Sequence, residues 1–394
     1  MYDVIVVGAR CAGSPTAMLL AQLGYRVLLL DRTSFPSDTV CAHLVTVPGV
    51  VRLDRWGLLE KVAASGSPPI RQLGVMLGGV SLSGPIPPLD GIAEMRCVRR
   101  TVLDSILVDA AVEAGADLRE AFVVRELLFD GDRVVGVRGR DVGGADVVHT
   151  ARLVVGADGL HSGVAAAVEA RHYGERPPAT WSCYAYWSGV TLDRVVIHLA
   201  ESRWVAAYPT NDDLVCVSVA WPVAEAGSFR ANLEASFLAT VDLVSGLADQ
   251  VRAGTRVRPF VGTADLPNFF RASHGPGWAL VGDAGYHKDP LLAQGISDAF
   301  RDAELLAEAI DSGLSGLQPL EHALVGYEER RNAAAMPGYE LNERLARLGG
   351  PTDDLSRLVR DPEHNAADAK RLQGVLVGAV PAGELRPPAG LALA

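Results

Sequence analysis

The first 31 residues alternate between apolar segments and a glycine-containing turn, and this pattern predicts a strand, a helix and a second strand. An apolar strand runs from Asp3 to Val7, and a turn separates it from an apolar helix over about Ser14 to Leu23. Gly24 ends the helix, and the second strand, Arg26 to Leu30, is followed directly by Asp31. This order predicts a βαβ unit, the building block of a doubly wound parallel sheet.

The next part of the chain changes from helical to strand periodicity. A polar, proline-containing stretch precedes a predicted helix from Arg100 to Glu113, which ends at Gly115. Two strands follow, Phe122 to Phe129 and Arg133 to Arg138, and the Asp-Gly-Asp sequence between them predicts a hairpin. A further strand, Arg152 to Val155, leads into a second glycine-containing turn.

Residues 181–222 alternate in polarity and are rich in aromatic side chains, which predicts a separate antiparallel sheet. The chain then returns to a strand at Trp278 to Val281, a glycine turn and a long helix over about Gly295 to Ile310. We therefore expect an α/β fold whose first domain is discontinuous, with an inserted antiparallel sheet. The last 45 or so residues predict a helical cap with a loose tail.

Composition and charge narrow the possible partners. The formal net charge is −11 and the basic residues are scattered, so we expect no nucleic-acid partner. No window approaches the roughly 18 to 20 apolar residues of a membrane span, and no signal peptide is recognisable. The five cysteines include no closely spaced pair, which predicts a cytoplasmic protein without a structural metal.

The first motif that carries chemistry is the glycine turn between the first strand and helix. Gly8 permits the tight turn, and Gly13 permits close packing of helix and strand, so that helix amides face a pyrophosphate. Asp31 is placed to accept hydrogen bonds from ribose hydroxyls and argues against a 2′-phosphate. Arg10 replaces the middle glycine and would crowd the phosphates unless its side chain turns away. The alternative is an ordinary glycine turn of an α/β domain.

Two further motifs also follow strands. One is the Asp158-Gly159 turn with Ser162, for which a plain turn is the alternative. The other is Gly282-Asp283, followed by Pro290 and the Gln294-Gly295 helix start. An acid at a strand end can hold a polyol hydroxyl, and the helix start can hold negative charge, although a capped helix alone would have the same sequence.

Together and in this order, the three motifs resemble those of the flavoprotein monooxygenase family of the para-hydroxybenzoate hydroxylase type. They resemble more loosely the geranylgeranyl reductases and flavin halogenases of the same superfamily. The resemblance covers about residues 1 to 345 and implies a Rossmann-type FAD-binding domain formed by residues 1–70, 91–170 and 268–345. It further implies a substrate-binding β-sheet domain (71–90 and 171–267) and a C-terminal helical cap and tail (346–394).

The resemblance also implies FAD as cofactor and NAD(P)H as electron donor. The FAD-binding residues that it implies are Gly8, Cys11, Ala12, Gly13, Asp31, Arg32, Arg100, Asp158, Gly282, Asp283, Gln294, Gly295 and Ile296. Asp283 would meet the ribityl hydroxyls, and Pro290 and the turn before α-helical Gly295 would lie beside the flavin ring. Ala165 stands where the family usually has an arginine, which weakens the NAD(P)H assignment, and Ala293 replaces a glycine.

The reaction implied is hydroxylation of a small aromatic or natural-product-like substrate with O2, through a flavin C4a-hydroperoxide. Candidate catalytic residues are His43, His287 and Pro290. Strand alternation places aromatic residues on common faces, so the candidate substrate-binding residues are Tyr184, Tyr186, His198, Trp204 and Tyr208. Each of these aromatic and histidine residues has a purely structural alternative.

Three other functions share the motifs. A geranylgeranyl-reductase-like enzyme would reduce double bonds without inserting oxygen, and a flavin-binding protein without turnover would retain the fold alone. A halogenase is disfavoured, because Trp204-Val205-Ala206-Ala207-Tyr208-Pro209 lacks a second tryptophan and no lysine lies between Lys61 and Lys288. We expect a monomer or homodimer whose partners are a small-molecule substrate and O2.

Overall fold

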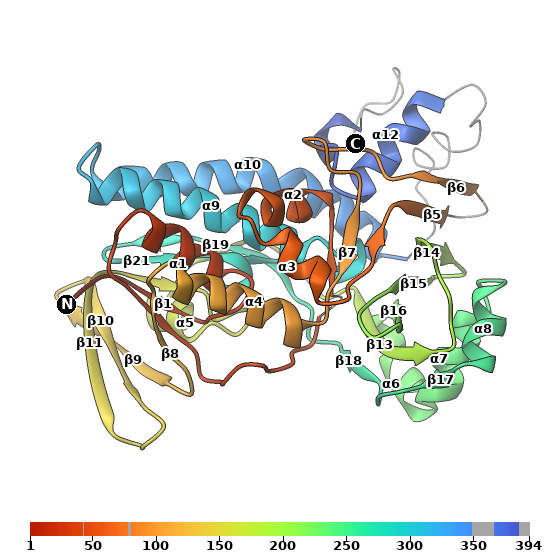
Figure 1. Cartoon of the computed structure of the whole chain (residues 1–394), viewed down its shortest axis with the longest axis horizontal. Helices are drawn as coiled ribbons and strands as arrows, with labels where there is room; N and C mark the ends of the chain where they lie inside the picture. The colour runs from red at the N-terminus through yellow and green to blue at the C-terminus, as the bar shows by residue number, and fades with distance from the viewer. Residues whose placement is uncertain (42, 78–79, 349–365, 386–394) are drawn as a thin grey trace.

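Two large sheets organise the chain, with long helices along one side (Figure 1). The structure is a computed structural model that describes residues 1–41, 43–77, 80–348 and 366–385. The first sheet carries the three glycine-containing motifs at its strand ends, and the second carries the aromatic segment.

The first sheet has a parallel core in the order β21-β11-β1-β2-β8, with β20 antiparallel at one edge and a β10-β9 ribbon extending from β11. Its strands are β1 (Tyr2–Val7), β2 (Val27–Leu30), β8 (Asp117–Arg119), β9 (Val123–Asp130), β10 (Arg133–Arg140), β11 (Asp146–Gly156), β20 (His274–Gly275) and β21 (Trp278–Leu280). Side chains alternate along β1, so its residues pack against different elements on the two faces of the sheet. Val4 and Val6 pack among helices α1 (Gly13–Gln22), α4 (Arg100–Glu113) and α9 (Gly295–Leu314), whereas Ile5 and Val7 pack on the other face with residues of the ribbon.

The second sheet has the order β17-β13-β16-β15-β14-β5-β6, with β18 also on β13. Its strands are β5 (Gln72–Leu77), β6 (Val80–Pro85), β13 (Thr180–Ser188), β14 (Val195–Ala200), β15 (Arg203–Pro209), β16 (Val215–Pro222), β17 (Thr255–Arg256) and β18 (Val261–Thr263). Apart from the parallel β14–β5 pair, its strands run antiparallel. One face packs against α6 (Ala226–Ala231), α7 (Leu233–Val241) and α8 (Leu247–Ala253). The other face packs in an apolar cluster with residues of α2 (Val47–Arg55), α10 (Leu320–Ala346) and α12 (Ala366–Leu376).

The remaining elements join the sheets. Helix α10 (Leu320–Ala346) runs along α9 (Figure 1), and α12 (Ala366–Leu376) packs in the same apolar cluster as residues of β5 and β6. Two small three-stranded sheets have the strand orders β3-β7-β4 and β12-β19-β22. Their strands and the other short elements are β3 (Leu44–Val45), β4 (Pro69–Ile70), β7 (Met95–Cys97), β12 (His172–Arg176), β19 (Asn268–Arg271), β22 (Tyr286–His287), α2 (Val47–Arg55), α3 (Leu59–Ala64), α5 (Gly163–Ala167), η1 (Val223–Glu225), η2 (Gly282–Ala284), η3 (Pro290–Leu292) and η4 (Ala382–Glu384).

The fold class predicted from the sequence is confirmed, with differences in detail. Strand β11 begins at Asp146 rather than at Arg152, because its first half pairs with β10 and only its second half enters the parallel core. The proline-containing stretch before Arg100 holds helices α2 and α3, which the pattern did not predict. Parts of the predicted cap and tail, 349–365 and 386–394, lie outside the described residues. Within the described ranges, no helix is both long and apolar enough to cross a membrane.

Candidate functional site

A cavity of about 920 Å³ runs from the strand ends of the first sheet to the inner face of the second sheet. All three glycine-containing motifs line it, and so do aromatic residues of β13 and β15. The predicted nucleotide end and the predicted substrate end therefore belong to one continuous space.

The nucleotide end is shaped by the backbone. Gly8 has a φ of +104°, and a Cβ added there would lie 2.4 Å from the carbonyl oxygen of Ala157. A Cβ on Gly13 would lie 1.7 Å from the carbonyl oxygen of Gly8, so only glycine permits this approach of helix and strand. Helix α1 has no side-chain cap at its start. The amide of Ser14 donates to the carbonyl oxygen of Arg10, but the amides of Ala12 and Gly13 have no hydrogen-bond partner among the described residues and can bind an anion.

Asp31 is buried beside this turn and its carboxylate has one position left for a ligand. Its Oδ2 accepts a hydrogen bond from the amide of Ala9 (2.7 Å), and its Oδ1 accepts two from Thr33, each 2.8 Å long. A carboxylate has about four lone-pair sites, so one remains for a ribose hydroxyl. The neighbouring Arg32 is exposed at the rim of the cavity.

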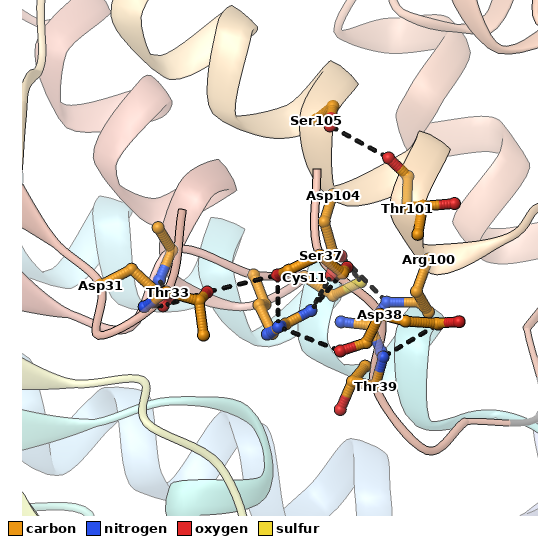
Figure 2. A network of polar contacts seen from close by, with 12 residues as sticks. Cys11, Asp31, Thr33, Ser37, Asp38, Thr39, Arg100, Thr101, Asp104 and Ser105 are labelled. Carbon is orange, nitrogen blue, oxygen red and sulfur yellow. Dashed lines mark hydrogen bonds and ion pairs between the residues drawn. The ribbon is translucent and has the colours of Figure 1, made fainter. Parts of the chain in front are cut away.

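The predicted crowding by Arg10 does not occur, because its side chain pairs with a buried carboxylate of α4, that of Asp104. Figure 2 shows Asp104 beside Cys11 and Arg100. Arg10 Nη1 lies 2.6 Å from Asp104 Oδ2, and Arg10 Nη2 donates to Ser37 Oγ at 2.8 Å. Asp104 also accepts from Arg100 Nε (2.9 Å) and from the Cys11 thiol (3.4 Å). Two guanidinium groups thus share one carboxylate, which fixes both of them in the cavity wall with a net positive charge near the phosphate end.

The Asp158 turn is held mainly by its own helix. Ser162 Oγ (2.5 Å) and the amide of Val164 (3.1 Å) donate to Asp158, whose pKa is raised by burial. Arg271 of β19 donates to the carbonyl oxygens of Leu160 (3.4 Å) and Ala284 (3.0 Å). Arg271 therefore links the second motif to the third, a link that the sequence pattern did not reveal because the arginine comes from a distant strand.

The third motif presents an unengaged acid and an open helix start to the cavity. Asp283 is exposed, lines the cavity and has no side-chain hydrogen-bond partner among the described residues, as a ligand of a polyol chain requires. Helix α9 has no side-chain cap, and a Cβ on Gly295 would meet nothing within 4 Å. Ala293, just before it, has a φ of +50°, the left-handed conformation that glycine adopts more easily.

A buried charged cluster at the start of α9 was missed by the sequence analysis. Lys288 Nζ lies 2.7 Å from Asp298 Oδ2 and 2.9 Å from Gln294 Oε1. Arg301 binds the other oxygen of Asp298 (2.8 Å) and also Asp302 (2.7 Å). Spacing in the sequence offered only the acidic and basic residues of one helix, and the fold adds Lys288 from the preceding loop.

The substrate end is the inner face of the second sheet. Tyr184, Trp204 and Tyr208 line the cavity, as alternation predicted, together with apolar residues such as Ile197. Tyr186 shares this face but does not line the cavity. Its hydroxyl lies 2.8 Å from Nε2 of His43, whose ring is completely buried.

His43 is held as a neutral residue at this end. Burial, together with the positive charge of Arg100, lowers its pKa to about 3. Its Nδ1 has no hydrogen-bond partner among the described residues, and its ring packs edge-on against Tyr184 at a centroid distance of 5.3 Å. An uncharged imidazole in this position adds no charge to the cavity.

The other predicted catalytic and substrate residues are placed differently. His287 and Pro290 line the cavity, and Nδ1 of His287 lies 2.5 Å from the carbonyl oxygen of Pro267. His198 does not line the cavity, and this expectation is corrected. Its strand neighbours Ile197 and Leu199 belong to the same apolar cluster as Tyr184, Trp204 and Tyr208, so strand alternation turns His198 to the opposite face of the sheet.

Taken together, the cradle fits FAD. It offers uncapped amides at α1 for a pyrophosphate, an acid for a ribose, a free acid for a polyol and an open helix start for a ring that becomes negatively charged. A cluster of His, Cys, Asp and Glu that could hold a metal ion does not occur in the described ranges.

Comparisons with known proteins agree with this geometry. Residues 1–338 match the protein family described as FAD binding domain. Digeranylgeranylglycerophospholipid reductase 1 of Methanopyrus kandleri is 28% identical, over 95% of this chain and 98% of that protein. Tryptophan 2-halogenase of Chondromyces crocatus is 27% identical, over 82% of this chain and 64% of that protein.

Solved structures show the same fold. The flavin-dependent brominase Bmp2 superposes with a TM-score of 0.82 at 21% identity, over 96% of this chain and 93% of that chain. PqsL of Pseudomonas aeruginosa, described as a probable FAD-dependent monooxygenase, superposes with a TM-score of 0.74 at 21% identity, over 93% of this chain and 99% of that chain.

Proposed function

This chain belongs to the FAD binding domain family and is an FAD-dependent enzyme, and from that premise we propose that it is a monooxygenase. Its substrate is a small, mostly apolar aromatic or natural-product-like molecule, and its electron donor is NAD(P)H. The observation that carries the proposal is the continuity of the 920 Å³ cavity, which joins the cofactor cradle to an apolar, aromatic wall.

The residues of the cradle position the cofactor. The amides at the start of α1 and the Arg10–Asp104–Arg100 group provide positive charge for the pyrophosphate, while Asp31 and Asp283 bind hydroxyls. When bound, FAD supplies the redox chemistry, accepting hydride and activating oxygen. The start of α9 stabilises negative charge that develops on the ring.

The residues of the second sheet hold the substrate and exclude water. Tyr184, Trp204 and Tyr208 present large aromatic surfaces, and burial raises the pKa values of both tyrosines above the usual value, so they remain protonated. The neutral His43 completes this wall. Such a wall favours an uncharged ring or chain over an anionic substrate.

A second candidate, reduction of a carbon–carbon double bond, is favoured by one observation. The reductase of Methanopyrus kandleri aligns with this chain over almost the full length of both proteins. Halogenation has less support, because the ammonium of Lys288 is bound by Asp298 and Gln294 instead of being free.

One experiment separates these reactions. The purified protein is reconstituted with FAD, and NADH and NADPH oxidation is followed with phenolic, polyketide and prenyl compounds, in air and without oxygen. Ligand-stimulated oxidation with ¹⁸O from ¹⁸O2 in the product supports the monooxygenase. Saturation of a double bond without oxygen would identify a reductase instead of a monooxygenase, and bromide-dependent product formation would identify a halogenase. Failure to bind FAD contradicts all three proposed activities.

A further inference from the structure

Lys288 differs from the other two lysines of the chain in its surroundings. Lys61 lies on the surface, where its side chain is 45% exposed and pairs with Glu113, and Lys370 is also exposed. The side chain of Lys288 is only 7% exposed and lies in the wall of the cavity. Burying an ammonium group costs several kcal/mol unless partners compensate, so a position in this wall requires an explanation.

The ammonium is fixed at the start of α9 by two partners from that helix. Gln294, the residue before the helix, accepts from Nζ at 2.9 Å, and Asp298 in the first turn pairs with it at 2.7 Å. Gln294, Asp298 and Lys288 all line the cavity, and the neighbouring Gly295 leaves open space there. The lysine therefore adds a full charge beside the partial positive charge of the helix end.

The carboxylate of the pair is ionised. Burial alone would raise the pKa of Asp298, but Lys288 and Arg301 outweigh it and lower this pKa to about 2. Arg301 is in turn bound to Asp302 at 2.7 Å and does not line the cavity. At the start of α9, the cavity wall thus pairs the cation of Lys288 with the anion of Asp298, whose charge is shared between Lys288 and a guanidinium behind it.

We propose that Lys288 raises the reduction potential of the bound flavin, because its ammonium stabilises the negative charge that FAD gains on reduction. The carboxylate of Asp298 partly offsets this increase. A fixed cation near the ring raises the reduction potential of a flavin, whereas an uncompensated carboxylate lowers it. The inference rests on the part of the proposed function that places FAD in this cavity, and it holds for a monooxygenase and for a reductase alike.

The test uses the FAD-loaded full chain and two measurements that need neither substrate nor oxygen. The first is the midpoint potential of the bound flavin. The second is the dissociation constant for sulfite, whose lone pair forms a bond to N5 and leaves negative charge on the ring. The variants are Lys288→Met, Lys288→Arg and Asp298→Asn, and Lys61→Met is the matched control at an exposed lysine.

We expect Lys288→Met to weaken sulfite binding at least tenfold and to lower the potential by about 30 mV, the equivalent of a tenfold change for a two-electron couple. Asp298→Asn is expected to change both quantities by a similar amount in the opposite direction. Lys288→Arg stays within threefold of the wild type because the charge is kept, and Lys61→Met is unchanged.

Opposite shifts in the Met and Asn variants separate an electrostatic role from a structural one, because both variants break the same ion pair. An unchanged Lys288→Met variant, or shifts of equal sign in both variants, overturns the proposal. If Lys288→Met does not retain FAD, Asp298→Asn decides alone. A higher potential with tighter sulfite binding supports the proposal, and no change or a change in the opposite direction overturns it. A wild-type protein that cannot bind FAD at all contradicts the proposed function instead.

Discussion

The two ends of the cavity differ in what forms them, the main chain at one end and side chains at the other. At the cofactor end, the main chain sets the shape: Gly8 and Gly13 bring strand and helix together where a Cβ has no room, and α1 offers uncapped amides. At the substrate end, side chains of β13 and β15 set the shape, and the backbone is engaged in the sheet. Backbone amides can bind a phosphate group in proteins of different sequence, so the cofactor end can be similar in many proteins. The substrate that the other end accepts depends on which side chains its strands carry.

The largest effect is expected from a change to the main-chain end. Gly13→Val would place side-chain atoms on the carbonyl oxygen of Gly8, which a Cβ already approaches to 1.7 Å. We expect no FAD-loaded protein, measured as visible flavin absorbance per chain after reconstitution. Gly227→Ala, where a Cβ has nothing within 4 Å, is the matched control. Normal loading of the valine variant would refute a backbone-defined cradle.

A smaller loss is expected when only one side chain of that end is removed. Asp31→Ala takes away a charged hydrogen-bond acceptor, typically about 1.5 to 3 kcal/mol, and should weaken FAD binding roughly 10- to 150-fold. Fluorescence titration of the apoprotein with FAD measures this change. Asp54→Ala on the exposed face of α2 should bind like the wild type. An affinity unaffected by Asp31→Ala would remove Asp31 from the site.

At the substrate end, the clearest effect concerns stability and pH. The pKa of His43 is about 3 in the folded protein, below the ordinary 6.5, so the unfolded chain binds its proton more readily. Stability is therefore lost as the pH falls below about 6.5, and His43 should account for a loss of about 2 kcal/mol between pH 7 and pH 5. Urea unfolding of wild type and His43→Gln at both pH values measures it, and an equal pH dependence in the two proteins would contradict a buried neutral imidazole.

The smallest effect is expected at His198, which lies on the face of the second sheet away from the cavity. His198→Ala should leave kcat/KM within twofold of the wild type for whichever substrate the screen identifies, whereas Trp204→Ala should not. A loss with His198→Ala comparable to the Trp204→Ala loss would show that the cavity wall extends through the sheet.

The same contrast explains what could be predicted from the sequence. Gly8, Gly13 and Asp31 are recognisable because a turn, a close approach and a hydroxyl acceptor each require a particular residue at a particular spacing. Strand alternation also grouped Tyr184 with Tyr186 and Trp204 with Tyr208 on common faces.

Other features depend on contacts between distant segments and leave no local pattern. Three contacts join residues from different elements: Arg10 pairs with Asp104, Arg271 bridges the second and third motifs, and Lys288 pairs with Asp298. The error at His198 has a related cause. Its residue type suggested chemistry, but the face of β14 is decided by the register with β15 and β5, which a single sequence does not reveal.

The parallel pairing of β14 with β5 has a consequence for how this protein could be divided. Strands β5 and β6 precede most of the first sheet in the chain, yet they complete the second sheet, more than 100 residues away in sequence. A cut in the exposed segment 176–178 would leave β5 and β6 on one fragment and the other strands of the second sheet on the other fragment. Neither fragment would contain all the strands of a complete substrate wall, so co-expressed pieces can regain the enzyme only by reassembling through an intermolecular β14–β5 ladder.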